Sequence, residues 1–119
     1  MRVALVAQNG KKEQLRAWAS KHRATLAGHD LVATGGTAQV LTECGLTARA
    51  LASGPLGGDL HVAHLVATGE VDFCVFLRDP AVHPAHEADV AALVRLALVH
   101  DVPLAQNEST ANAVLTAPL

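Results

Sequence analysis

The chain has 119 residues, 50% of them hydrophobic, and a formal net charge of −2 at pH 7. This length and apolar content suit one domain, residues 1–119, built around one core. Lysine and arginine are scattered along the chain, and no run reaches the roughly 18 apolar residues that a membrane-spanning helix needs. The short apolar run at the start lacks the pattern of a secretory signal. Composition therefore argues against nucleic-acid and membrane partners and predicts a cytoplasmic protein.

Five short apolar runs predict strands, in chain order at 2–7, 30–34, 47–51, 72–77 and 102–105. Most of these runs are continuously apolar, which is typical of strands covered on both faces of a parallel sheet. Helical spacing of apolar residues predicts helices between and after them, at about 11–27, 37–44, 58–68, 87–100 and 108–115. The repeated β then α order predicts an α/β fold, a doubly wound three-layer sandwich around a mainly parallel five-stranded sheet.

The loops that follow the predicted strands contain most of the polar residues with chemical potential. In a doubly wound sheet, ligands bind in the crevice at the carboxyl ends of the strands. The segments expected at that edge are 8–12, 34–37, 53–59, 78–89 and 106–110. We therefore expect one binding site built from several of these loops.

The stretch VATGGTAQV places two glycines and two threonines at the entrance of a predicted helix. Free amides and the helix dipole favour an anion there, and glycine allows an oxyanion to approach the backbone. The residues that could surround a phosphate at this edge are Lys12, Thr34, Gly35, Gly36, Thr37, Ser53 and Gly54. The alternative is an ordinary turn with a threonine cap. The stretch matches neither the P-loop nor the dinucleotide-binding pattern.

Three carboxylates and one imidazole fall on the same edge: Asp59, Asp79, Asp89 and His86. Each acid also has a structural explanation, because Asp59 and Asp89 begin helices and Asp79 precedes a proline in a turn. Brought together and partly buried, neighbouring carboxylates raise the pKa of an aspartate from about 3.9 toward that of a useful base. His86 could then polarise or protonate a substrate oxygen.

Zinc is the alternative for the histidines, because two pairs are spaced three residues apart: His83 with His86, and His61 with His64. No H-E-x-x-H pattern or Cys-His set accompanies them, so we predict no metal site. Cys44 and Cys74 form no C-x-x-C pair and lie in apolar elements. The default for them is two buried, reduced thiols, with a ligand role as the alternative.

Six stretches, in this order, resemble methylglyoxal synthase over residues 2 to about 115: VALVAQNGKK, VATGGT, SGPLGGD, FLRDP, PAHEADVAALVRLA and VPLAQN. The combination of SGPLGGD with RDP and HEAD farther along is the most specific part. The resemblance implies the doubly wound fold of that family. It also implies a lyase that converts dihydroxyacetone phosphate to methylglyoxal and inorganic phosphate, without metal or organic cofactor, as a homohexamer.

The resemblance also assigns roles to individual residues. It implies that Asp59 is the catalytic base, which removes a proton from the carbon bearing the hydroxyl group. It places His86 at the carbonyl end of the substrate and makes Asp79 and Asp89 the acids that orient the catalytic machinery. Ser53 and Gly54 correspond to substrate contacts. The corresponding phosphate and substrate positions are Gln8, Lys12, Thr34, Gly35, Gly36 and Thr37.

The chain departs from the usual family pattern at several positions. Gln8 and Asn9 replace a His-Asp pair, so neutral amides stand where a chargeable ligand is usual. Gly36 replaces a threonine, which removes a hydroxyl donor worth about 0.5–1.5 kcal/mol, and we expect weaker substrate binding. Residues 106–107 read Gln-Asn in place of Thr-Asn, and the sequence ends at Leu119, before a tail that supplies a phosphate-binding arginine in longer members.

These departures motivate a second hypothesis, a non-catalytic module on the same fold that binds phosphate or a phosphorylated metabolite. A scaffold without any ligand is a third, which the polar loops disfavour. Turnover of dihydroxyacetone phosphate, or stabilisation by a phosphate compound without turnover, separates the first two.

Overall fold

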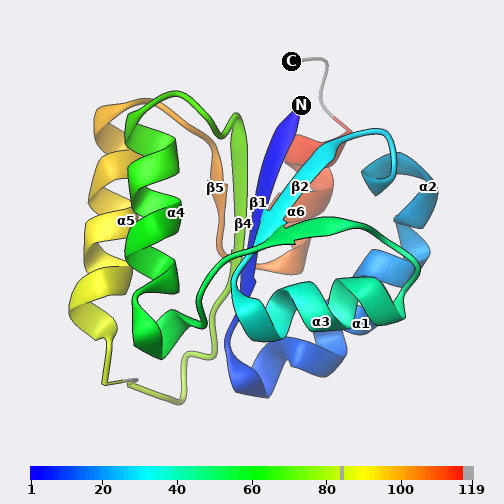
Figure 1. Ribbon diagram of the computed structural model, residues 1–119, viewed down its shortest axis with the longest axis horizontal. Coiled ribbons are helices and arrows are strands. Elements are labelled where there is room, and N and C mark those ends of the chain that lie inside the picture. Colours follow the sequence, from blue (N-terminus) through cyan, green and yellow to red (C-terminus); the bar gives the residue numbers. More distant parts are fainter. Residues whose placement is uncertain (84, 117–119) are drawn as a thin grey trace.

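The computed structural model describes residues 1–83 and 85–116, which contain five parallel strands flanked by helices (Figure 1). The strands are β1 (Arg2–Ala7), β2 (Asp30–Ala33), β3 (Ala48–Ala50), β4 (Phe73–Leu77) and β5 (Leu104–Ala105). The α-helices are α1 (Lys12–Lys21), α2 (Arg23–Leu26), α3 (Gly35–Glu43), α4 (Gly58–Ala67), α5 (Glu87–Val99) and α6 (Glu108–Leu115). Two short 3-10 turns, η1 (Asn9–Lys11) and η2 (Gly54–Leu56), complete the described elements.

The sheet order is β3-β2-β1-β4-β5, and each neighbouring pair is parallel. The predicted doubly wound α/β fold is therefore confirmed. Within the described ranges, no helix combines the length and the apolar character needed to cross a membrane.

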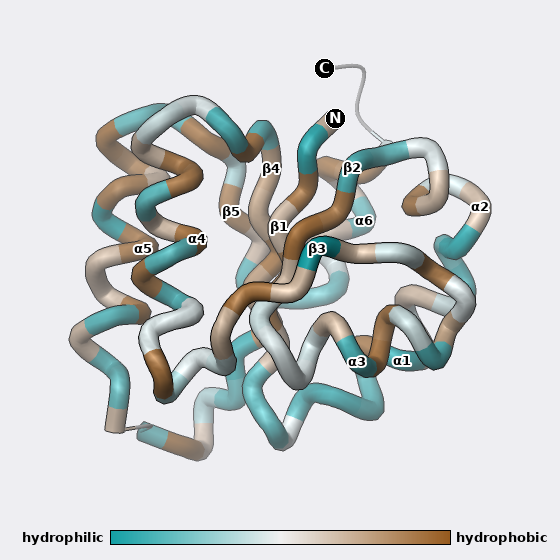
Figure 2. The backbone as a smooth tube through the Cα atoms, in the orientation of Figure 1, coloured by the Kyte–Doolittle hydropathy of each residue, from teal (hydrophilic) through white to brown (hydrophobic). Residues whose placement is uncertain are grey.

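Two hydrophobic layers cover the two faces of the sheet. On one face, side chains such as Leu5 pack with α1, α2, α3 and α6, and Trp18 is buried there. On the other face, Val6 packs with Val62 of α4 and Leu93 of α5. Figure 2 shows the hydrophobic residues concentrated along the central strands, while the helices alternate between hydrophobic and hydrophilic residues. Because both faces are covered, the strands are apolar at successive positions.

The chain winds outward in both directions from β1. It runs through α1 to β2 and through α3 to β3, whereas β4 and β5 lie on the other side of β1. The helices that follow β1 and β4 therefore cover opposite faces (Figure 1), and such a divergence leaves a crevice at the carboxyl ends of the two strands. Ala7 pairs with Leu77 in register, so the loops that begin at Gln8 and Arg78 leave the sheet side by side.

The prediction of one continuous helix over 11–27 is wrong, because the structure interrupts it. The structure begins this segment with η1, ends α1 at Lys21 and starts α2 at Arg23. The break lies at His22, which has φ −104° and ψ 18° and whose ring packs against Trp18 with 5.3 Å between the ring centroids. Leu26 still reaches the core beyond the break, so the hydrophobic stripe continues although the helix does not.

The edge strands are shorter than the sequence predicts. β3 covers three residues of the predicted 47–51, and β5 covers two residues of the predicted 102–105. Each lies at one edge of the sheet and has a single strand partner. Arg49 is exposed, so β3 is not covered on both faces as the buried strands are. The other elements begin and end within two residues of their predicted bounds.

The two cysteines differ in their burial. Both thiols are free, and Cys74 is completely buried in β4, as predicted. Burial raises the pKa of Cys74 to about 12, and the charge of Asp59 adds to the rise. Cys44 is half-buried rather than buried, because it lies at the exposed end of α3, where its Sγ donates to the Arg16 carbonyl oxygen.

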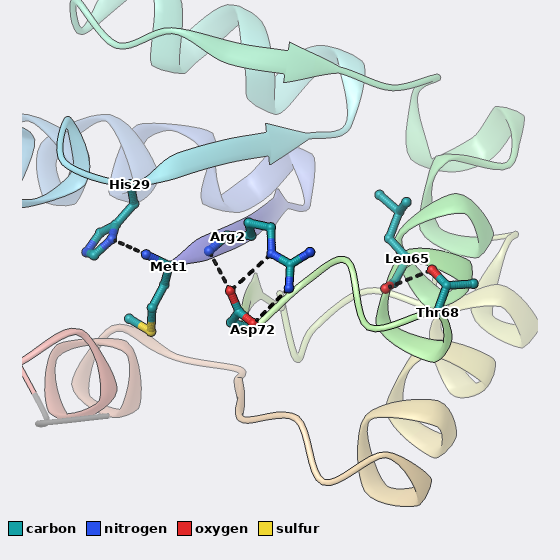
Figure 3. A network of polar contacts seen from close by, with 6 residues as sticks. All are labelled: Met1, Arg2, His29, Leu65, Thr68 and Asp72. Carbon is teal, nitrogen blue, oxygen red and sulfur yellow. Dashed lines mark hydrogen bonds and ion pairs between the residues drawn. The ribbon is translucent and has the colours of Figure 1, made fainter.

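Polar contacts hold the start of the chain at the amino ends of the parallel strands (Figure 3). The ammonium group of Met1 donates to Nδ1 of His29 at 2.9 Å, and the backbone amide of Arg2 donates to the Asp72 carboxylate at 2.8 Å. The Arg2 guanidinium donates to both oxygens of the same carboxylate. These contacts join the beginning of β1 to the segments that enter β2 and β4, and so help to fix the register of the central strands.

Candidate active site

A cavity of about 210 Å³ opens at the carboxyl edge of the sheet, where the loops after β1 and β4 diverge. Sites for drug-sized ligands usually span about 300–1,000 Å³, so this cavity suits a smaller molecule. The predicted site residues that line it are Gln8, Lys12, Thr34, Gly36, Ser53, Gly54, Asp59, Asp79 and His86. The structure thus brings together most of the side chains that the sequence singles out.

Asp59 and His86 form a hydrogen-bonded pair in this cavity. The Asp59 side chain is completely buried, and its Oδ2 accepts a hydrogen bond from Nδ1 of His86 at 2.7 Å. Its Oδ1 is also buried and has no hydrogen-bond partner among residues 1–83 and 85–116. A buried carboxylate oxygen that no protein donor satisfies is placed to accept a proton from a ligand.

Glycines allow the backbone to bring Asp59 to this position. Gly57 has a left-handed φ of +98° at the end of η2, a conformation that glycine adopts without a steric penalty. A Cβ on Gly58 would lie 2.0 Å from the Ala52 carbonyl oxygen, so α4 can begin directly against the preceding loop only with glycine there. Asp59 then lies in the first turn of α4 and faces the cavity. A Cβ on Gly54 would lie 3.2 Å from its Oδ1.

The electrostatics of the cavity favour a basic carboxylate. Burial raises the pKa of Asp59 above its usual range, the hydrogen bond and charge of His86 oppose the rise, and the charge of Asp89 adds to it. Burial lowers the pKa of Lys12, and the negative charge of Asp59 offsets part of that change. The Lys12 ammonium donates to the Ala7 carbonyl oxygen and lines the cavity. A stronger base and a cation thus share one small space.

The predicted phosphate residues divide into two groups. Lys12, Thr34 and Gly36 line the cavity. Thr37 is completely buried, and its hydroxyl accepts from the Ala7 amide at 3.0 Å and lies 3.2 Å from the Thr34 hydroxyl. In the described part of the chain, neither Thr37 nor Gly35 lines the cavity. The Gly35 amide donates to the Ala52 carbonyl oxygen at 3.4 Å, so the contribution of this turn to an anion site would come from the Gly36 and Thr37 amides, which have no acceptor within the helix.

The remaining acids also differ in position. Asp79 lines the cavity, whereas Asp89 does not and acts on it through the effect of its charge on Asp59. Asn9, which the sequence analysis names beside Gln8, also lines the cavity. Sequence reasoning did not single out several other lining residues: Val6, Ala7, Gly10, Pro55, Phe76 and Val82. The apolar members belong to strand ends or proline turns and carry no chemical signal. Gly10 did carry a signal in the sequence, because a glycine in the loop where the chain leaves the sheet can mark a place where another group approaches the backbone closely.

A larger cavity, of about 630 Å³, lies at the opposite edge of the sheet and has charged residues around buried aliphatic side chains. Two of its lining residues, Arg2 and His29, are engaged in the contacts of Figure 3. In residues 1–83 and 85–116, no group of three or more His, Cys, Asp or Glu side chains is arranged to hold a metal ion. The buried carboxylate with a free oxygen therefore points to the smaller cavity as the reactive site.

The sequence and the fold are similar to those of known methylglyoxal synthases. A family model described as the MGS-like domain matches residues 14–106. The chain is 45% identical to the methylglyoxal synthase of Carboxydothermus hydrogenoformans over 118 residues, which cover 98% of each chain. It is 46% identical to the methylglyoxal synthase of Moorella thermoacetica over 93% of this chain and 88% of that protein. The crystal structure of methylglyoxal synthase from Elizabethkingia anophelis is 37% identical and superposes with a TM-score of 0.92, covering 98% of this chain and 78% of that chain. The chain belongs to the MGS-like domain family and, within it, to the methylglyoxal synthases.

Proposed function

We propose that this chain converts dihydroxyacetone phosphate to methylglyoxal and inorganic phosphate, with Asp59 as the base. The observation that carries this proposal is the buried carboxylate of Asp59: one oxygen accepts from His86, and the other has no donor among the residues that the structure describes. Family membership supports the same reaction. A base with a raised pKa, held beside a cavity for a small molecule, suits the removal of a proton from a carbon next to a carbonyl group.

The first step transfers a proton from the hydroxyl-bearing carbon of the substrate to Oδ1 of Asp59. The electron pair of that C–H bond moves toward the carbonyl oxygen and gives an ene-diolate. His86 hydrogen-bonds to the base through Nδ1, and its Cε1 lies close to the space left open at Gly54. The ring can donate to the oxygen on which charge develops through Nε2, when both ring nitrogens carry protons. Donors that are already in place stabilise that charge without reorganisation.

The second step eliminates phosphate. The proton of the terminal hydroxyl group passes to the departing phosphate, the electron pair of that O–H bond moves along the carbon chain, and the C–O bond to the phosphate breaks. The remaining enolate takes up a proton on carbon and becomes methylglyoxal, while Asp59 gives up its proton and returns to the carboxylate. Lys12 is the cation in the same cavity, and Thr34 and Ser53 provide hydroxyl groups, so these three residues are suited to hold the departing phosphate.

The test is incubation of the purified protein with dihydroxyacetone phosphate, with released phosphate and methylglyoxal measured separately. Equal amounts of the two products are expected, and Asp59→Asn is the control for background decomposition. Stabilisation of the fold by phosphate compounds without turnover would instead support the binding module. Release no faster than with the Asp59→Asn variant would overturn the catalytic proposal.

We also infer a cytoplasmic homohexamer, as the family resemblance implies. Three exposed apolar side chains support a subunit contact: Leu56 is 80% exposed, Leu60 47% and Val82 51%, and Val82 lines the cavity. Contiguous exposed apolar side chains are typical of a protein interface. Light scattering during size-exclusion chromatography should give the mass of six chains, and Leu56→Glu should give smaller species. A monomeric wild-type protein would contradict this inference.

A further inference from the structure

Gln8 and Asp79 join the two loops that diverge after β1 and β4. The backbone amide of Asp79 donates to Oε1 of Gln8 at 2.7 Å, and the backbone amide of Gln8 donates to the Leu77 carbonyl oxygen at 3.2 Å. The Asp79 carboxylate lies directly against Gly10, since a Cβ on Gly10 would fall 2.3 Å from Asp79 Oδ2. Gly10 is not among the glycines with positive φ, so its backbone conformation suits other residues, but a Cβ there would displace the Asp79 carboxylate.

Asp79 begins the segment that leads to His86. Its Oδ1 accepts from the Ala81 amide at 3.0 Å, and its carbonyl oxygen accepts from the Val82 amide at 3.3 Å, which closes a turn. Beyond the turn, the Arg78 guanidinium donates to Oε1 of Glu87 at 2.8 Å and so bridges the two ends of the segment. His86 directly precedes Glu87. The position of His86 against Asp59 therefore depends on how the beginning of this segment is held.

The Asp79 amide also fixes the orientation of the Gln8 side chain. Because Oε1 of Gln8 accepts from Asp79, its Nε2 is the group that remains for a ligand in the cavity that Gln8 lines. The oxygen of this side-chain amide is thus bonded within the protein, and its NH2 group remains a donor for a ligand at every pH. Loss of the acceptor alone should loosen the Asp79 turn without removing a charge from the cavity.

We propose that Gln8 and Gly10 are positioning residues, which seat Asp79 and, through the turn that it begins, set His86 against Asp59. The inference rests on the proposed function, because the Asp59–His86 pair is the catalytic pair assigned there. It changes the expectation drawn from the sequence, in which Gln8 affects substrate affinity. Removal of the Gln8 oxygen should lower kcat rather than raise KM.

Gln8→Met removes the acceptor and keeps the length of the side chain, whereas Gln8→Glu keeps an acceptor for the Asp79 amide. We expect Gln8→Met to lower kcat about tenfold to hundredfold, since small misplacements of catalytic groups have effects of this size, and to raise KM as well, because methionine also lacks the Nε2 donor. Gln8→Glu should restore kcat but raise KM, because its charge repels phosphate. The matched control is Gln14→Met, since Gln14 donates to Glu108 instead. Wild-type kcat in Gln8→Met would overturn the proposal.

The Gly10→Ala variant tests independently how the Asp79 carboxylate is positioned. The added methyl group should displace the carboxylate and lower kcat, while circular dichroism shows whether the variant folds. In the Asp79→Ala background the obstructing carboxylate is gone, so Gly10→Ala should have no further effect. Equal losses in the two backgrounds would show that Gly10 does not act through Asp79 and would overturn its assigned role.

A readout without turnover distinguishes this inference from the proposed function. The proton on Nδ1 of His86, identified by its loss in His86→Gln, should give a downfield NMR resonance while it is hydrogen-bonded to Asp59. This resonance should shift or disappear in Gln8→Met and persist in Gln8→Glu. The same pattern in a protein without turnover would reject the proposed function and support the positioning role. An unchanged resonance in Gln8→Met would overturn the positioning role, whatever the activity.

Discussion

Replacement of Asp59 by asparagine tests the assignment of the base, because the two side chains have the same shape. The asparagine carbonyl oxygen can still accept from Nδ1 of His86, so the cavity should keep its form. A hydrogen bond to a charged group contributes about 1.5–3 kcal/mol and a neutral one about 0.5–1.5, so the exchange loses roughly 1–1.5 kcal/mol. Asparagine also removes a buried charge, which stabilises the folded state. The two effects offset each other, and we expect a melting temperature within about 5 °C of wild type.

Turnover should respond far more strongly than stability. Asparagine cannot accept the substrate proton, and loss of a general base lowers rates by about 100-fold to 10,000-fold. The assay is phosphate and methylglyoxal release from dihydroxyacetone phosphate, with thermal unfolding of both proteins followed by circular dichroism. A folded Asp59→Asn variant that keeps more than about a tenth of the wild-type rate would refute the assignment.

The same pair of proteins gives a pH dependence with a defined sign. Folding raises the pKa of Asp59 above its ordinary value of 3.8, so the folded state binds this proton more tightly than the unfolded chain does. The resulting stabilisation is fully present below 3.8 and is lost as pH rises through the folded pKa. The melting temperature of wild type relative to Asp59→Asn should therefore fall as pH rises across that window. The acid limb of kcat/KM should lie above 3.8.

Three further substitutions test other parts of the structure. A Cβ on Gly36 would lie 3.1 Å from Lys12 Cε, so Gly36→Thr should displace Lys12 and should not improve KM; a lower KM would contradict this. Lys12→Met should raise KM about tenfold or more, since a hydrogen bond to a charged group is lost, and an unchanged KM would remove Lys12 from the phosphate site. Asn112→Ala leaves the buried Trp18 indole N–H, now 2.7 Å from Asn112 Oδ1, without an acceptor. Urea unfolding should show a loss of about 1–3 kcal/mol with turnover unchanged.

The fold could be predicted because burial on both faces leaves a direct mark on the strands of a parallel sheet. β1 and β4 are continuously apolar, and the alternation with helices fixes the class. The break at His22 leaves no such mark, because Leu15, Trp18 and Leu26 keep helical spacing across it. The lengths of edge strands such as β3 are not marked either, since one side of such a strand lacks a strand partner and its burial is incomplete.

The location of the site could be predicted, but the division of its hydrogen bonds could not. Parallel strands bring their following loops to one edge, and this rule alone gathers Asp59, Asp79 and His86. Whether a hydroxyl or amide group hydrogen-bonds to a ligand or to another part of the protein depends on the direction of the side chain, which the residue type does not determine. Thr37 turns inward to the end of β1, and Gln8 gives its oxygen to Asp79.

The replacements at Gln8 and Gly36 are compatible with catalysis because they leave the charges that the reaction needs in place. The proposed base, Asp59, and the cation of Lys12 both line the cavity together with His86. An amide at position 8 holds the Asp79 turn at any pH, whereas a histidine there would change its charge near neutrality. Gly36 leaves space beside the Lys12 side chain, which a threonine would restrict. The chain therefore lacks one hydroxyl donor and one titrating group, and the raised pKa of Asp59 contributes the acid limb of the pH dependence.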